Sequence, residues 1–468
     1  MSRPAEGFGA RFAAPLVLGP ALNSINTTMI SVALVPIADA TGASAAQVVL
    51  LVAGLYLAGA IAQPVAGGLV DRYGPRRVYV TGMAVAALAG LVPLVVPTFE
   101  AALAARVAVG VGTSSAYPAA LAAISAQEQR TGHAPPRGLF SALSVSSLTS
   151  AAVGPVLGGL LVASFGWTAV FVANAPYGLT AIVLALLWLP RDRDRPAPPR
   201  PDGAARTGPD LVGLLLFVGA VGSALVAALG LWPGPGRYGL LGLAAAATVG
   251  LVLWERRRPV PFVDVRTLTG RPALVRTYAR LFLVYSCTYL VLYGVTQWLQ
   301  ATAGYAADAA GWMQLPAVVL AGAAAALAAR TRGLRLPLLL AAALPAVGGL
   351  LLTRLTDSTP TWLVLITIAL FGPSQGLAAV ANQVALYAQA PPDRTGVLAG
   401  MSRTAVQLGA VGATAVIGPL FAQGATSAGL HATGWIITAL AAAALVLTAA
   451  DPALRGVSPD DPRGSPQR

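Results

Sequence analysis

Long apolar stretches separated by short polar loops run through the whole chain. Each stretch holds about twenty residues, the length at which an α-helix crosses the hydrocarbon layer of a bilayer. The pattern predicts about fourteen membrane-spanning helices. They lie at 13–38, 45–70, 78–97, 101–126, 138–164, 167–189, 211–232, 238–254, 274–298, 309–329, 336–354, 360–386, 397–422 and 432–450. The segment 238–254 is short, and a re-entrant segment is the alternative interpretation there.

Composition supports helices in a membrane. Hydrophobic residues make up 56% of the chain and charged residues 10%, whereas soluble domains carry about 25% charged residues. Backbone groups in lipid must be satisfied internally, by helices or by a closed barrel. Barrel strands alternate in polarity over roughly ten residues, and the apolar runs here are long and unbroken. The predicted fold class is therefore an all-α integral membrane protein.

The arginines predict the orientation of the chain. All 30 basic residues are arginines, and the formal net charge is +13. With both termini placed inside, the arginines of the loops gather on the inner side, and only Arg237 and Arg354 remain outside. This bias follows the positive-inside rule and indicates a protein of the cytoplasmic membrane rather than one that binds nucleic acid. The same bias fits twelve spans as well as fourteen.

The Pro- and Arg-rich segment 191–210 predicts a cytoplasmic linker. It separates an N-terminal six-helix bundle, 1–190, from an inserted helix pair at 211–254 and a C-terminal six-helix bundle at 255–450, with a cytoplasmic tail at 451–468. Cys287 is the single cysteine, and the histidines His133 and His431 lie far apart in the sequence. We therefore expect no disulfide, no metal site and no cofactor.

The loop after the second span carries a dense motif. Gly67, Asp71, Arg72, Gly74, Arg76 and Arg77 stand at its defining positions. This motif resembles the inner-loop signature of the major facilitator superfamily, where the loop acts as a conformational latch between two halves. The segment 329–335 echoes it weakly in the second half, with Arg330 at the position of Asp71. The resemblance implies a major facilitator fold of two six-helix bundles, here with the extra helix pair.

The fifth span carries a second motif, made of Gly154, Pro155, Gly158 and Gly159. It is similar to the antiporter signature of the fourteen-helix drug:proton antiporters of that superfamily. Proline bends a helix and glycines allow close packing. The resemblance implies proton-linked export of a drug, an antibiotic or a secondary metabolite.

The first span departs from this family pattern. Asn26 stands where the family usually carries a buried, proton-binding aspartate. No other span has a carboxylate near its middle, so coupling would rest on an edge residue such as Asp39 or Asp308, on titration of the solute itself, or be absent. Arg106 is expected to be the only clear charge within the apolar layer, and an intramembrane charge is a candidate functional residue. We hypothesise that it favours neutral or anionic solutes.

In the superfamily, the first and fourth helices of each half line the solute cavity. The candidate solute-binding residues on these helices are Asn23, Asn26, Arg106, Tyr117, Tyr285, Tyr289, Tyr293, Gln297, Gln375 and Asn382. Tyr285, Tyr289 and Tyr293 follow one another at steps of four residues and share or nearly share one helical face. Such a stripe suits a bulky aromatic solute, although tyrosines at helix ends also occur as interfacial anchors.

The sequence therefore predicts a transporter that exports a small organic solute by alternating access, with protons as a coupling ion, and with membrane lipids as its other partner. We expect a monomer. The alternative is uptake or facilitated diffusion of an organic acid or nutrient without proton coupling. A membrane enzyme is a third class, but no cluster of His, Asp and Glu converges in the sequence. Direct ATP drive through a P-loop is excluded because the chain has no lysine.

Overall fold

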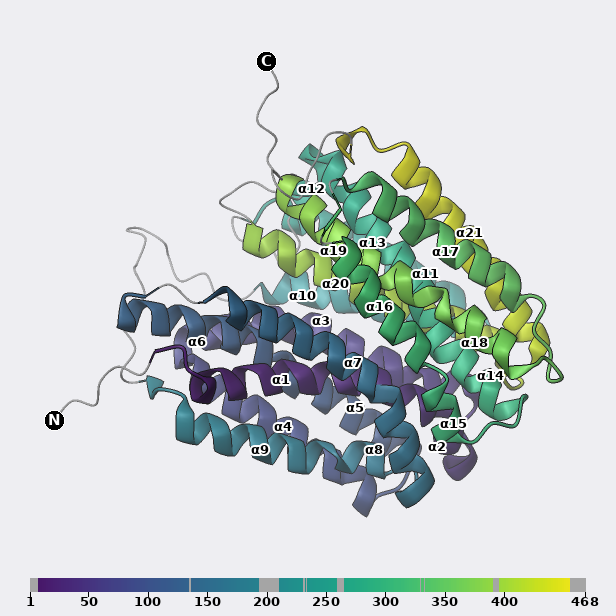
Figure 1. Cartoon of the computed structure of the whole chain (residues 1–468), viewed down its shortest axis with the longest axis horizontal. Helices are drawn as coiled ribbons and strands as arrows, with labels where there is room; N and C mark the ends of the chain where they lie inside the picture. Colours follow the sequence, from purple (N-terminus) through teal and green to yellow (C-terminus); the bar gives the residue numbers. More distant parts are fainter. Residues whose placement is uncertain are drawn as a thin grey trace.

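The computed structural model describes residues 7–133, 136–192, 210–229, 232, 234–258, 265–328, 330–331, 333–389 and 395–454. Within them all regular structure is helical (Figure 1). The first part of the chain contains α1 (Ala10–Met29), η1 (Ile30–Val32), α2 (Leu34–Thr41), α3 (Ala45–Tyr73), α4 (Pro75–Val95), α5 (Phe99–Ser114), α6 (Ala116–Thr131), α7 (Arg137–Phe165), α8 (Ala169–Val172) and α9 (Asn174–Trp188). Two further helices, α10 (Leu211–Ala228) and α11 (Gly236–Glu255), pack against each other.

The second part of the chain follows the same plan. It contains α12 (Val265–Gly270), α13 (Pro272–Leu290), η3 (Val291–Val295), α14 (Thr296–Ala301), α15 (Ala307–Trp312), α16 (Leu315–Ala328), α17 (Arg335–Leu352), α18 (Thr361–Ala369), α19 (Phe371–Gln389), α20 (Thr395–Leu420), α21 (Ser427–Ala449) and η4 (Pro452–Leu454). We refer to α1–α9 as the first half and to α12–η4 as the second half. The boundaries predicted for the domains remain predictions, and most of the linker and tail lie outside the described residues.

Within the described residues, every predicted span coincides with one helix or with two or three successive helical segments. Ten helices of the described part are long and apolar enough to cross a membrane, and the bent pair Ala10–Val32 and Leu34–Thr41, at 59°, raises the number to eleven. The number fourteen stays a prediction. Because α11 is one unbroken helix of 20 residues, the structure does not support the re-entrant alternative for that segment.

The surface of the molecule shows which solvent it faces. Large apolar side chains, among them Leu88, Leu187, Leu215 and Val446, are more than half exposed on the outward sides of different helices. A soluble monomer rarely exposes apolar surface on this scale. Lipid is the solvent that fits this surface, and the chain is a multi-pass membrane protein.

Close helix contacts hold each half together. In the first half α1 packs on α7 and α4 packs on α9, while in the second half α17 packs on α21 and α16 on α19. Glycines lie at such crossings: a methyl group at Gly434 of α21 would lie 2.6 Å from the Gly349 carbonyl oxygen of α17. Since lipid provides no hydrophobic drive between helices, small residues that let backbones approach supply van der Waals contact instead.

The two halves meet along defined elements. We call the end of the bundle near Ala10 and Leu454 the terminal end, and the opposite one the distal end (Figure 1). At the distal end η1 and α2 contact α14, and α7 contacts α15. The helices α3 and α20 also pack on each other, from Val49 and Gly418 near the distal end to Gly59 and Gln407 farther along.

Candidate functional site

Arg106 lies in the centre of the first half, on α5. Its side chain is 1% exposed. The Nε atom donates to the carbonyl oxygen of Leu51 at 3.0 Å, and Nη1 donates to the carbonyl oxygen of Asn26 at 3.1 Å. The Nη2 atom has no hydrogen-bond partner among the described residues. Arg106 therefore connects α5 to α3 and α1 through backbone acceptors, and no described carboxylate neutralises it.

The Asn26 side chain uses both hydrogens of its amide. Its Nδ2 atom donates to Asn174 Oδ1 at 2.6 Å and to the carbonyl oxygen of Leu22 at 2.9 Å. One turn away, Asn23 is half-buried and donates to the Thr113 hydroxyl at 3.2 Å. An ionised carboxylate cannot donate a hydrogen bond. The hydrogen bonds at position 26 therefore require the N–H donors of an amide, which an ionised aspartate lacks.

A stack of tyrosines runs along α13 and η3. The ring centroids of Tyr285 and Tyr289 are 6.2 Å apart, and those of Tyr289 and Tyr293 are 5.9 Å apart with an interplanar angle of 9°. Tyr56 of the first half meets the Tyr289 ring edge-on at 5.3 Å. The Tyr293 hydroxyl donates to the carbonyl oxygen of Thr27 at 2.6 Å. The tyrosines of the second half therefore touch the first half directly.

The π-helical turn η3 explains the alignment of this stack. Four residues along an α-helix make slightly more than one turn, so side chains at that spacing drift around the axis. The wider π turn at Val291–Val295 drifts the other way, because its hydrogen bonds join residues five apart. Tyr289 and Tyr293 are consequently almost parallel. π turns of this kind are frequent at functional sites.

Two glycines of the antiporter motif allow α7 to pack closely against the bent first span. A methyl group at Gly158 would lie 2.6 Å from the carbonyl oxygen of Met29. A methyl group at Gly154 would overlap the Thr28 hydroxyl oxygen. Pro155 lies within this helix. The motif therefore allows α7 to pack closely at the position where α1 ends and η1 begins.

The third glycine of the motif faces the other half. A methyl group at Gly159 would lie 2.6 Å from the Ala307 carbonyl oxygen and 2.7 Å from Asp308 Cα. From the opposite side, a methyl group at Gly311 would overlap the Pro155 carbonyl oxygen. We call this contact between α7 and α15 the distal seam. The half-buried Asp308 lies in it, whereas Asp39 is exposed on α2.

The candidate solute-binding residues separate into two groups by exposure. In this conformation Asn26, Arg106, Tyr293, Gln297 and Asn382 are buried. Gln297 donates to the Tyr293 carbonyl oxygen, and Asn382 accepts from Arg280. The other group keeps accessible surface and consists of Asn23, Tyr117, Tyr285, Tyr289 and Gln375.

A second buried charge corrects one sequence-based expectation. Arg280 on α13 is 1% exposed, and its Nη1 atom lies 2.6 Å from Asp451 Oδ2. Arg276 binds the other oxygen of Asp451 at 2.8 Å. The prediction that Arg106 is the only charge within the apolar layer was therefore wrong. The chain separates Arg280 from its acid by 171 positions, so no local spacing pattern signals the pair.

The loop between α3 and α4 is held by the segment after α9. Gly74 has φ of +93°, a backbone conformation that side chains disfavour. The Asp192 carboxylate accepts from the Arg76 and Arg77 backbone amides at 3.0 and 2.9 Å. It thereby caps the N-terminus of α4. These described contacts stay within the first half, and the Asp71 side chain lies outside what the structure describes.

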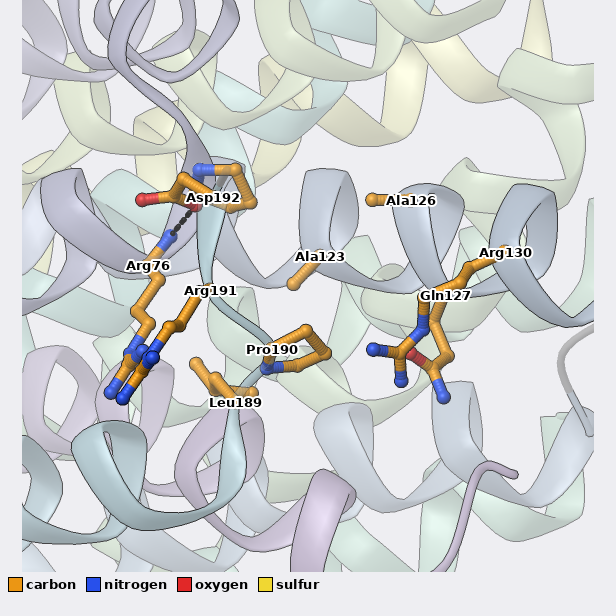
Figure 2. A pocket seen from close by; sticks show the side chains of 10 residues that line it. Arg76, Ala123, Ala126, Gln127, Arg130, Leu189, Pro190, Arg191 and Asp192 are labelled. Atoms are coloured by element: carbon orange, nitrogen blue, oxygen red, sulfur yellow. Dashed lines mark hydrogen bonds between the residues drawn. The ribbon is translucent and has the colours of Figure 1, made fainter. Parts of the chain in front are cut away.

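The same corner carries a strong positive charge. Figure 2 shows Arg76 and Arg191 side by side, with Gln127 and Arg130 of α6 across a small pocket. The exposed Arg72 stacks on the Tyr73 ring at 5.2 Å, and a methyl group at Gly67 would meet no described atom within 4 Å. No described helix therefore packs against Gly67 in this conformation.

Comparison with known proteins identifies the family to which the chain belongs. The model of the Major Facilitator Superfamily matches residues 16–414. The chain therefore belongs to the major facilitator superfamily of transporters. The uncharacterized MFS-type transporter YwoD of Bacillus subtilis is 27% identical, over 94% of this chain and 96% of its own length. The tetracenomycin C resistance and export protein of Streptomyces glaucescens is 28% identical, over 87% of this chain and 75% of its own.

Solved structures agree on the fold. A bacterial homologue of the human lysosomal transporter Spinster, in an inward-facing and unoccupied conformation, covers 100% of both chains with a TM-score of 0.64 at 15% identity. At this identity the likeness concerns the fold alone.

Proposed function

We propose that the protein exports a small organic solute across the cytoplasmic membrane by alternating access, with its terminal end in the cytoplasm. The observation that carries this proposal is the closed distal end. There η1 and α2 contact α14, and α7 meets α15 at the distal seam. Such a conformation would receive solute from the terminal side and release it after the distal contacts part.

The direction of transport draws support from one relative. The name of the Streptomyces glaucescens protein describes resistance and export. The arginine-rich corner at the terminal end, with Arg76, Arg130 and Arg191, agrees with a cytoplasmic position for that end. The residues that would meet the solute in this conformation are those that keep surface, led by Tyr117, Tyr285 and Tyr289.

We assign proton coupling to Asp308 rather than to Asp39. Asp308 lies in the distal seam, so its protonation state bears on a contact that must open and close. A carboxylate is costly to enclose when ionised and less so when protonated. Asp39 is exposed and has no comparable contact with the described part of the second half.

Facilitated diffusion of an organic acid or nutrient is the second candidate. It is favoured by one observation, the amide network of Asn26 and Asn174 at the place where the family pattern has an aspartate. Without a buried proton-binding group, the carrier would equilibrate its solute in either direction.

Reconstitution into liposomes with an imposed pH gradient tests the proposal. We expect the gradient to drive solute accumulation, a protonophore to abolish it, and Asp308→Asn to remove the dependence on the gradient. Asp357→Asn, in an exposed loop, is the matched control and should behave as wild type. Transport that ignores both gradient and protonophore would establish the facilitator instead.

A further inference from the structure

Arg403 is an exposed arginine on α20, a helix that packs against both halves. On one side, a methyl group at Gly409 would lie 3.1 Å from the Phe282 carbonyl oxygen of α13. On another side, a methyl group at Gly59 of α3 would lie 3.3 Å from Gln407 Nε2. Arg403 lies one turn before Gln407 and therefore on the same side of the helix. Its side chain is exposed although its helix is central.

The Arg403 guanidinium lies against a tyrosine ring of the first half. Its central carbon lies 4.6 Å from the centroid of the Tyr117 ring, which belongs to α6 in the first half. In the second half, Tyr285 packs in one apolar cluster with Met401 and Ala405, which lie two residues before and after Arg403 on α20, and the Tyr289 ring lies 6.2 Å from the Tyr285 ring. Three of the five accessible candidate solute-binding residues therefore lie in the neighbourhood of this one cation.

Arg403 has no acidic partner within the described part of the chain. The ion pairs found there join Arg258 to Asp210, and Arg276 and Arg280 to Asp451. Arg106 offers a useful contrast, because backbone carbonyl oxygens engage it and its side chain is buried. Unlike Arg106, Arg403 keeps an exposed side chain that a solute can reach.

We propose that Arg403 binds the anionic group of the transported solute while Tyr117, Tyr285 and Tyr289 contact its aromatic body. The proposal rests on the transport function above and names the class of solute, a planar aromatic anion. The chemistry suits this class. A guanidinium presents paired N–H donors that match a carboxylate or a phenolate and also stacks on aromatic faces. A bound anion would take over the hydrogen-bonding edge of Arg403 and leave the contact with the Tyr117 face in place.

Equilibrium binding to the purified full-length protein in detergent tests the proposal. The probes are fluorescein, an anion, and rhodamine 123, a cation, because both share a xanthene core. Fluorescence polarisation reports the two affinities. Wild-type protein should bind fluorescein more tightly, and raising NaCl should weaken fluorescein binding while leaving rhodamine 123 unchanged or slightly stronger.

The variant Arg403→Gln should lower fluorescein affinity about tenfold, as expected for the loss of roughly 1.4 kcal/mol, and should leave rhodamine 123 binding intact or improved. Arg403→Lys keeps the charge and should retain most of the preference for the anion. Arg354→Gln, at an exposed arginine of the distal end, is the matched control and should bind both dyes as wild type does.

Several outcomes would overturn the proposal. These are wild-type protein that fails to bind fluorescein or prefers rhodamine 123, an Arg403→Gln variant that binds fluorescein normally, and one that loses both dyes equally. The last would mean that the contact with Tyr117 is structural. Since binding in detergent needs neither a direction nor a gradient, anion preference can hold even where the liposome experiment refutes export, and the two failures remain distinct.

Discussion

The guanidinium of Arg106 and the backbone of Asn26 are joined by a hydrogen bond of 3.1 Å in the buried centre of the first half. The same guanidinium binds the Leu51 carbonyl oxygen, so one side chain fixes the positions of three helices. A cation held by carbonyl oxygens of α1 and α3 is primarily part of the scaffold in this conformation. Removal of the Arg106 guanidinium should therefore slow the transport of every solute to a similar extent.

Arg106→Lys tests this consequence. A lysine ammonium lacks the planar fork needed to reach both carbonyl oxygens, and each hydrogen bond to a charged group contributes about 2 kcal/mol. We expect a lower melting temperature in detergent and slower transport of anionic, neutral and cationic solutes together. Loss confined to anionic solutes, with normal stability, would instead support the hypothesis that Arg106 selects for charge.

Asn26→Asp should change the pH dependence of transport. The substitution removes the donor groups that bind Asn174 and Leu22 and places a titratable group beside Arg106. We expect transport to become more sensitive to pH than in wild type, measured as initial rates in liposomes between about pH 5 and 8, a range in which carboxyl groups in proteins can titrate. Asn26→Leu, which removes the same hydrogen bonds without adding a titratable group, is the control and should keep the pH profile of wild type. Equal pH profiles for Asn26→Asp and wild type would contradict the expectation.

Gly159→Ala should weaken the distal seam. Its methyl group would lie 2.6 Å from the Ala307 carbonyl oxygen, and overpacking of this kind costs about 1–3 kcal/mol. We expect the seam to open more often, which a cysteine at Ala307 in a Cys287→Ser background would report through faster labelling by a membrane-impermeant reagent. Gly322→Ala on α16, where a methyl group meets nothing within 4 Å, should label at the wild-type rate. Unchanged labelling in Gly159→Ala would show that the seam accommodates the methyl group.

Asp451→Asn should destabilise the second half. It leaves Arg280 buried beside Arg276 without a counter-charge, and breaking a buried ion pair from one side costs about 3 kcal/mol or more. Thermal unfolding in detergent measures the loss. Replacing both members, as Arg280→Met with Asp451→Leu, should recover much of the stability, because an apolar pair needs no desolvation of charge. A single variant as stable as wild type would show that Arg276 and Arg280 find other partners.

Apolar length predicted the helices well because a span must satisfy its own backbone, and this requirement is local. The four-residue spacing likewise predicted that Tyr285, Tyr289 and Tyr293 would align, as their neighbouring rings show. Patterns of this kind depend on residues close in sequence.

Contacts between distant residues were not predictable in this way. The partners Asn26 and Asn174 are 148 positions apart, and nothing near either residue indicates the other. Arg403 was missed for a different reason. Its position within an apolar run suggested no neighbour, and only the packing of α20 against both halves brings it next to Tyr117.

The long contact between α3 and α20 has a consequence for the balance between the two orientations of the carrier. It reaches from Val49 and Gly418 to Gly59 and Gln407, and we expect the two halves to turn about it with this contact retained. An interaction present in both end states stabilises both equally and leaves their populations unchanged. Substitutions along this line that preserve the contact should therefore leave the populations of the two orientations unchanged, whereas substitutions at the distal seam should shift them.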